Sequence, residues 1–237
     1  MRRARALAVA CCLLISALAA IAIVLLRPGL VPWRNIPLPA IDLAVARPWL
    51  VDRRLAALGR DAGLCRRVLQ PPHIVAEPIA DQAPAAGCGW TNAVRLASAG
   101  GARIALDRLS CEAAAAVALW IEHEVQPLAE AAFGARVARI EHRGGYACRD
   151  IVGNPRWRGI RSEHASANAV DIAGFVLADG RQIDVRRHWS GGGAEAEFLR
   201  RVHAGACRYF RVTLGPDYNA AHHDHFHLDR GPDRQCR

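Results

Sequence analysis

The hydrophobic and polar positions divide the chain into an apolar start, a proline-rich stretch and a long mixed part. The apolar start covers residues 6–26, is interrupted only by Ser16 and follows three arginines. About twenty apolar residues suffice for a helix to cross a bilayer, and flanking basic residues favour the cytoplasmic side. We therefore expect residues 1–5 in the cytoplasm, a transmembrane signal anchor over 6–26 and the remaining chain outside. A cleaved signal peptide is the alternative, although its apolar region is usually shorter, about 7–15 residues.

The proline-rich stretch covers residues 27–50 and contains five prolines. Proline fixes the backbone φ angle and has no N–H to donate, so such a stretch does not join a helix or a sheet readily. We expect an extended, semi-rigid linker here. The remaining residues, 51–237, are enough for one domain with its own hydrophobic core.

Two stretches of the mixed part have the spacing of helices. Apolar residues recur every three or four positions over 52–69, which predicts an amphipathic helix. A second helix is predicted over 110–133, with Ser110 as its N-cap and Gly134 as its end. Pro127 should kink or divide this helix. Three charged or titratable residues within it are expected to form a solvated face: Glu122, His123 and Glu124.

Short apolar stretches predict the strands and one further helix. Strands are expected over 104–106, 137–140, 169–177 and 208–213, and a helix over 194–203. We therefore predict an α+β fold, in which the helical first half of a single domain packs against a small, mostly antiparallel sheet.

Histidines are concentrated near the C-terminus, where residues 222–229 hold four of the ten in the chain. Imidazole is the commonest metal ligand in proteins. If this stretch is a strand, its alternation places four side chains on one face of the sheet. They are His223, His225, His227 and Asp229. A catalytic zinc ion usually takes three protein ligands, so this stretch would be part of a site, and a solvated histidine tract is the alternative.

His164 and Asp171 are the candidates for the missing ligands. Asp171 lies within the apolar stretch 169–177, and a carboxylate in such a strand is costly unless it is paired or bound to a metal. A metal ion at the edge of the strand would stabilise it. Pairing with one of the many arginines is the alternative.

Net charge limits the choice of partners. The formal net charge is +9, and all 31 basic residues are arginines. A basic exported domain favours anionic surfaces such as cell-wall polymers and lipid headgroups. We expect no nucleic-acid partner, because export is predicted and no nucleic-acid-binding motif is present.

Six cysteines follow the apolar start: Cys65, Cys88, Cys111, Cys148, Cys207 and Cys236. An even number in an exported domain predicts disulfides, and six cysteines allow fifteen pairings. The sequence does not choose among them. As a working hypothesis we pair Cys65 with Cys88, Cys111 with Cys148, and Cys207 with Cys236.

Two motifs carry a resemblance to known families. Ser162-x-His164 with Ala169-x-Asp171, followed by His225-x-His227, resembles the zinc peptidases that cut peptidoglycan peptides, the D-Ala-D-Ala carboxypeptidase and murein endopeptidase group. The chain departs from that group at Ala167, where the group has glycine. The whole stretch from Cys65 to the C-terminus resembles the bacterial extensin-like C-terminal domain. The matching pieces are Gly87-Cys88-Gly89, Leu109-Ser110-Cys111, Tyr146-Ala147-Cys148-Arg149, residues 164–175, residues 214–219 and Asp224-His225-Phe226-His227.

The resemblance implies a role for each matching residue. It assigns zinc to His164, Asp171 and His227, a catalytic role to His225 and His222, and substrate binding to Arg149, although the last match is loose. Carboxypeptidases of the group use a glutamate base before the last histidine motif; this chain has none there, which favours histidine as the base.

The function implied by the resemblance is that of a membrane-anchored zinc hydrolase acting on peptide bonds of peptidoglycan. The expected location is the inner membrane, crossed once, with the domain in the periplasm. The alternative is a cell-wall-binding or structural envelope module that keeps the fold without turnover.

Overall fold

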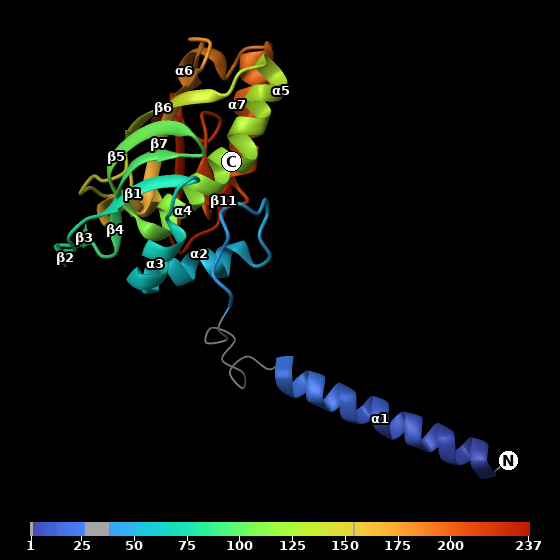
Figure 1. Ribbon diagram of the computed structural model, residues 1–237. Helices are drawn as coiled ribbons and strands as arrows, with labels where there is room; N and C mark the ends of the chain where they lie inside the picture. The colour runs from blue at the N-terminus through green and yellow to red at the C-terminus, as the bar shows by residue number, and fades with distance from the viewer. Residues whose placement is uncertain (1, 27–37, 154) are drawn as a thin grey trace. The chain divides into compact units, whose positions relative to one another are not determined.

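The computed structural model describes residues 2–26, 38–153 and 155–237, which fall into two units, 1–39 and 40–237. In the first unit, α1 spans Arg2–Leu26 (Figure 1). The membrane span predicted over 6–26 falls within α1; among the residues that the structure describes, no helix is both long enough and apolar enough to cross a membrane. Most of the predicted linker, 27–37, lies outside the described residues.

The second unit is a mixed α+β domain built on a nine-stranded sheet in the order β1-β4-β5-β6-β7-β10-β9-β11, with β8 paired to β7. Neighbouring strands are antiparallel except for the pairs β5–β6 and β9–β11. A separate hairpin joins β2 to β3. The strands are β1 Ile74–Pro78, β2 Gln82–Ala85, β3 Cys88–Trp90, β4 Ala93–Ala99, β5 Ala102–Ser110, β6 Val137–Gly144, β7 Ala169–Leu177, β8 Gln182–Asp184, β9 Val212–Leu214, β10 Phe226–Asp229 and β11 Gln235–Cys236.

This sheet confirms the predicted α+β class and the mostly antiparallel pairing, but it is larger than predicted. Strands β1 to β5 all lie within residues 74–110, in the half of the domain predicted to be helical. In β5, burial alternates along the strand: Ala102, Ile104 and Leu106 are buried, and the residues between them are exposed. Such a two-residue period is typical of a strand, and the prediction of a helical first half did not take it into account.

Six α-helices of the described domain pack around the sheet: α2 Val51–Arg60, α3 Ala62–Val68, α4 Cys111–Trp120, α5 Gln126–Phe133, α6 Val185–His188 and α7 Ala194–Ala206. The helix predicted over 52–69 is two helices, because Asp61 ends the first and its side chain caps the second at Leu64 N, 2.8 Å away. The helix predicted over 110–133 is present. Its division near Pro127 takes the form of a π-helical segment, Ile121–Val125, between α4 and α5.

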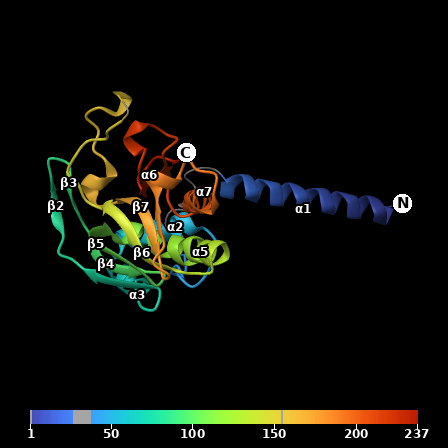
Figure 2. The ribbon, with the colours of Figure 1, turned by 90° about the horizontal axis from the view of Figure 1, so that it is seen from above.

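Helix α4 is the centre of the core. Its alanines and its terminal Trp120 are almost completely buried, as expected of a helix that is apolar on every side. The Trp120 indole donates a hydrogen bond of 2.8 Å to the Val202 carbonyl and so joins α4 to α7. Helices α5 and α7 lie side by side (Figure 2). The expected solvated face is wrong for Glu124, which is buried and paired with Arg208.

Residues 40–50, assigned to the linker from sequence, contact the domain. Ile41 and Leu43 are 4% and 3% exposed and belong to the hydrophobic core. The Leu43 carbonyl oxygen also lies 2.8 Å from His123 Nε2.

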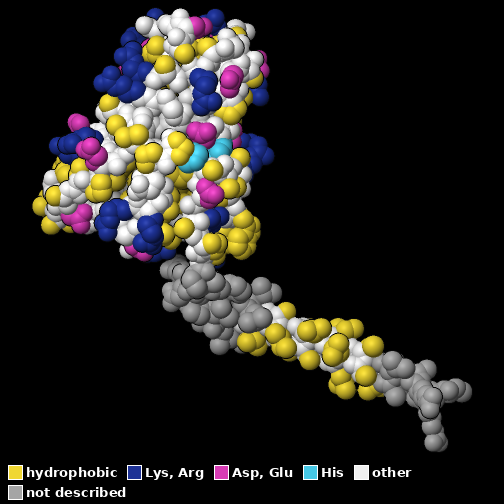
Figure 3. Space-filling model, in the orientation of Figure 1, with side chains coloured by type: hydrophobic (Ala, Val, Ile, Leu, Met, Phe, Trp, Pro, Cys, Tyr) yellow, Lys and Arg dark blue, Asp and Glu magenta, His cyan; other side chains and the backbone are white. Residues whose placement is uncertain are grey.

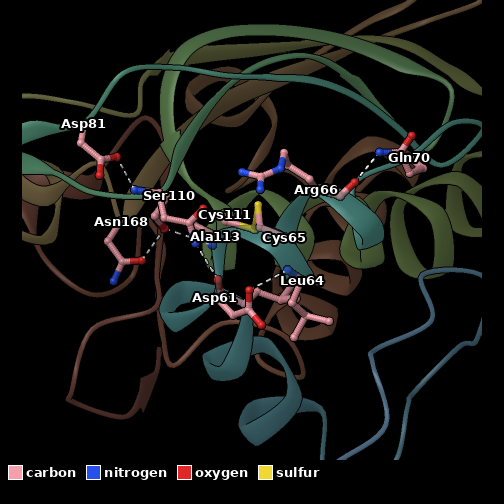
Figure 4. Close-up of a disulfide and its surroundings, with 12 residues drawn as sticks. Asp61, Leu64, Cys65, Arg66, Gln70, Asp81, Ser110, Cys111, Ala113 and Asn168 are labelled. Carbon is pink, nitrogen blue, oxygen red and sulfur yellow. Dashed lines mark hydrogen bonds between the residues drawn. A yellow bond between two sulfur atoms is a disulfide. The ribbon is translucent and has the colours of Figure 1, made fainter.

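Three disulfides confirm that the six cysteines are oxidised: Cys65–Cys111, Cys88–Cys148 and Cys207–Cys236. Only the last matches the predicted pairing. The other two predictions were wrong because packing places α3 beside α4, and the β2–β3 hairpin beside the loop before Arg149, so the nearest partners are not sequence neighbours. Figure 4 shows Cys65–Cys111 next to Ser110, the N-cap of α4, whose hydroxyl donates to Asn168 Oδ1 at 2.8 Å.

Candidate metal centre

Two of the predicted ligands are brought together by strand pairing. In the antiparallel ladder between β7 and β10, His227 lies directly opposite Asp171. Directly opposite residues of antiparallel strands present their side chains on the same face, about 5 Å apart. Both side chains are therefore held by the centre of the sheet, and both residues are less than 10% exposed.

His164 comes from a short 3-10 helix, Glu163–Ser166, that precedes β7. The Ser162 side chain caps this helix by accepting from His164 N, and Ala167 ends it with a positive φ of 55°. This is the position where the zinc peptidases have glycine, which suits a left-handed backbone better than alanine does. The Ala167 side chain is completely buried against Trp90 and Ala93, which holds the His164 turn in place.

Three donor atoms converge at this point. His164 Nε2 lies 3.1 Å from Asp171 Oδ1 and 3.2 Å from His227 Nδ1, and the last two atoms are 3.1 Å apart. A tetrahedral zinc ion with donors at about 2.0–2.1 Å would space those donors roughly 3.3–3.4 Å apart. The triangle is close to that size, and two imidazole nitrogens with one carboxylate oxygen are ligands that zinc accepts. These residues could therefore hold a divalent metal ion.

The remaining nitrogen of each histidine has an acceptor. His227 Nε2 donates to Asp229 Oδ2 at 2.8 Å, and His164 Nδ1 donates to the Gly145 carbonyl oxygen at 3.4 Å. Metal-binding histidines usually have such outer partners, which fix the ring and leave the inner nitrogen free to bind. The sequence placed Asp229 on the same strand face as His227, and the structure makes it the outer partner of the His227 ring.

Charges at this centre are strongly coupled. Burial raises the pKa of Asp171, but the hydrogen bonds and charges of His164 and His227 lower it more, and the pKa falls far below its usual range. Burial lowers the pKa of His227, but hydrogen bonds to Asp171 and Asp229 raise it more, to about 9. The carboxylates thus favour a cation among them, either a proton or a metal ion.

His225 lies beside the donor triangle, just before β10 begins. Its Nδ1 donates to Asp224 Oδ1 at 2.9 Å, and its Nε2 lies 3.6 Å from Asp171 Oδ1. Arg143 holds the other oxygen of Asp224 at 2.5 Å. The pKa of Asp224 is lowered, because the hydrogen bonds to His225 and Arg143 outweigh the effect of burial. Arg143 and Asp224 thus orient the His225 ring with Nε2 toward the centre.

His222 lies in a short 3-10 helix, Ala220–His222. Its Nδ1 donates to Asn219 Oδ1 at 2.7 Å, and its ring centroid is 5.3 Å from that of His225 and 5.9 Å from that of His227. Burial and the neighbouring positive groups lower the pKa of His222 to about 4.

His223 is placed differently from the sequence expectation. β10 begins only at Phe226, so the alternation from residue 223 onward does not hold, and the His223 side chain is 58% exposed. His225 and His227 both face the centre, but His223 does not.

The centre opens into a cleft of about 520 Å³, whose lining includes the candidate residues Asp171, His222, His225, His227 and Arg149. On the face shown in Figure 3, basic and acidic side chains of the domain are interspersed. Three of the arginines that line the cleft are paired with carboxylates: Arg143 with Asp224, Arg161 with Asp150, and Arg234 with Asp52. Arg149 donates to the Asp150 carbonyl oxygen at 3.3 Å, and no carboxylate of the described residues forms an ion pair with it. It is therefore suited to bind an incoming carboxylate.

Comparison with protein families gives one match. The family described as "Extensin-like protein C-terminus" matches residues 63–237, which includes every residue of the candidate centre. No curated protein and no solved structure matches the chain.

Proposed function

The chain belongs to the extensin-like protein C-terminus family, and from the donor triangle in its matched part we propose that it is a zinc-dependent hydrolase of peptide bonds in peptidoglycan. The observation that carries this proposal is the convergence of His164, Asp171 and His227 within 3.2 Å of one another, with outer partners on both histidines. The same residues match the motif of the zinc peptidases that cut peptidoglycan peptides. A zinc ion bound there would supply a Lewis acid that activates water and polarises the scissile carbonyl.

The residues around the donor triangle can each take a different part in the reaction. His225 Nε2 faces the centre and can take a proton and return it to the leaving amine, as a general acid-base group does. Asp224 and Arg143 hold the ring and stabilise the positive charge that it acquires. His222 Nε2 can accept a hydrogen bond from the substrate, because its Nδ1 hydrogen is given to Asn219. Arg149 can pair with a carboxylate of the substrate peptide.

We place this activity outside the cytoplasm, in the periplasm. The three disulfides support that location, because such bonds persist in oxidising compartments. Attachment to the membrane by the segment 6–26 stays a prediction.

A second candidate function is a wall-binding module without turnover. Residues 208–237 contain no glutamate that could take the role of the base used by carboxypeptidases of the related group. If histidine does not replace it, the cleft would bind peptidoglycan peptides and leave them intact.

One experiment separates the two functions. The purified full-length protein, loaded with zinc, is incubated with isolated peptidoglycan, and new amino ends are counted. A hydrolase should release them, whereas Asp171→Asn and chelator-treated protein should not. Binding to peptidoglycan without new amino ends would favour the wall-binding module. If the protein shows no binding and no cleavage, both functions are refuted.

A further inference from the structure

A loop between β6 and β7 forms one wall of the cleft and has no role in the proposed chemistry. The structure describes its residues 150–153 and 155–161, and Figure 2 shows them in gold, extending away from the sheet beside the C-terminal segment. Its two ends are paired: Asp150 and Arg161 form an ion pair of 2.6 Å, and Ile151 N donates to the Ile160 carbonyl at 2.8 Å. The Arg161 guanidinium also donates to the Ala86 carbonyl at 2.9 Å. The base of the loop is therefore fixed to the domain.

Asn219 joins the loop to the candidate centre. Its Nδ2 donates to the Gly153 carbonyl at 3.3 Å, and its Oδ1 accepts from His222 at 2.7 Å. Gly153 has a φ of +81°, and a side chain there would come within 2.7 Å of the Ala221 Cβ. The loop is thus in direct contact with the segment that positions His222.

The loop exposes an unusual share of apolar surface. Val152, Trp157 and Ile160 are 53%, 38% and 46% exposed. They are three of the six large hydrophobic side chains that are exposed among the described residues of the second unit. Single exposed apolar residues are normal, but a cluster next to a cleft marks a binding surface. All three also line the cleft of the candidate centre.

Charge indicates the kind of ligand. The loop carries three arginines against one aspartate, and Arg149 precedes it directly. Apolar side chains among arginines suit an anionic chain with apolar groups and suit a cation poorly.

We propose that the described residues of this loop, 150–153 and 155–161, form a second binding surface for the polymer, which holds the part of an anionic peptidoglycan strand that lies beyond the bond at the candidate centre. This inference rests on the proposed function for the identity of the polymer. Trp157, Ile160 and Val152 pack against apolar groups of the strand, and Arg158 pairs with its carboxylates. Because the base of the loop is already fixed, binding requires little ordering of the protein.

The test measures sedimentation of the full-length protein with insoluble peptidoglycan, for wild type and for Trp157→Ala. A tryptophan at the centre of a binding surface contributes strongly to affinity, so the dissociation constant should rise by at least about tenfold. Trp157→Phe should recover most of the affinity. Trp49→Ala is the matched control: Trp49 is 71% exposed in the same unit but does not line the described cleft, so its replacement should change nothing.

Cleavage assays separate this inference from the proposed function. Trp157→Ala should raise KM for the polymer far more than KM for a short wall peptide, because the short peptide does not reach the loop. If wild type cleaves the polymer and Trp157→Ala matches it in affinity and KM, the loop is not a binding surface although the function stands. If wild type binds through Trp157 without cleaving, the hydrolase fails and the binding surface stands. The inference would be overturned if Trp157→Ala and Trp49→Ala lost the same affinity for peptidoglycan, or if the wild type did not bind peptidoglycan.

Discussion

His225 and His222 both direct Nε2 toward the cleft, but their outer nitrogens donate to different groups. His225 donates to the Asp224 carboxylate and His222 to the Asn219 amide oxygen. A carboxylate stabilises the positive ring that forms when histidine takes a proton, whereas a neutral amide does so much less. The two histidines are therefore equipped for different tasks, His225 for proton transfer and His222 for accepting a hydrogen bond.

Asp224→Asn should test this division. The amide can donate to His225 Nδ1 and so favour the wrong tautomer, and loss of a general acid-base group typically costs about 10²–10⁴ in rate. We expect kcat for peptidoglycan cleavage to fall within that range, with the bound zinc and KM unchanged. His223→Ala is the comparison: its ring lies 3.4 Å from Asp224 Oδ2 but is 58% exposed and does not face the centre, so it should have the smallest effect on the rate. Wild-type kcat in Asp224→Asn would show that Asp224 has no positioning role.

Metal content distinguishes ligands from their neighbours. His227→Ala should lose zinc and activity together, whereas His225→Ala should keep about one zinc per chain, as a single catalytic centre requires, and lose most of its activity. Asp229→Asn replaces the charged acceptor of His227 Nε2 by a neutral amide and should weaken zinc affinity by about 10–100-fold. Elemental analysis measures the zinc content of each variant, and competition with a chelator measures its zinc affinity. Loss of zinc from His225→Ala would mean that His225 is a ligand.

At the scale of elements, the Cys207–Cys236 disulfide encloses β9, β10 and the turns between them. Every histidine of the C-terminal cluster lies within this closed loop, and its C-terminal end pairs with β9 through β11. The bond therefore restrains the segment that carries half of the candidate centre.

Replacing both Cys207 and Cys236 by alanine should lower the free energy of unfolding. Loss of a native disulfide in a small exported domain typically costs about 2–5 kcal/mol. Denaturant titration of wild type and of the double variant measures the difference. Thiol titration of unreduced, denatured wild type is the control, and only Cys11 and Cys12 should react. An unchanged unfolding midpoint would show that the bond does not restrain the native fold.

An element could be predicted from sequence where its pattern of apolar residues reflects burial. β7 was predicted with its observed bounds because its run of apolar residues is buried on both faces. β10 was predicted three residues too early, because alternating histidines resemble a strand whether or not the backbone pairs. The candidate ligands His164 and Asp171 could be proposed from their motif, but Arg143 and Asn219 could not. Their roles depend on contacts with residues that are distant in sequence or on the exact form of a turn.

At the scale of the whole molecule, a buried ionic cluster joins α2, the first helix of the domain, to the end of the segment that carries the four C-terminal histidines. Arg230 is 3% exposed and contacts Asp52 of α2 at 2.8 Å and Glu112 of α4 at 2.6 Å. Arg211 and Arg234 also pair with Asp52, at 2.9 Å and 2.5 Å. The two ends of the domain are therefore held together at a single carboxylate.

This cluster should make the domain sensitive to acid. Burial raises the pKa of Asp52, but the hydrogen bond to Arg211 and the charges of Arg230 and Arg211 lower it more, from 3.8 to about 2. A lowered pKa stabilises the folded state above the unfolded value, and this contribution is lost as the pH falls through the folded value. Asp52→Asn should unfold more easily at pH 7 and show a shallower loss of stability between about pH 4 and 2. Parallel curves of unfolding free energy against pH for variant and wild type would contradict this.

The Cys207–Cys236 bond has a further consequence when a protease cuts the chain. A cut anywhere in the 29-residue interval that it closes leaves both fragments covalently attached. Such a nicked chain would migrate as one species in an unreduced gel and as two after reduction. The cut ends would stay close to their native positions. A single cut among the C-terminal histidines would therefore leave the residues that line the cleft attached to the rest of the domain.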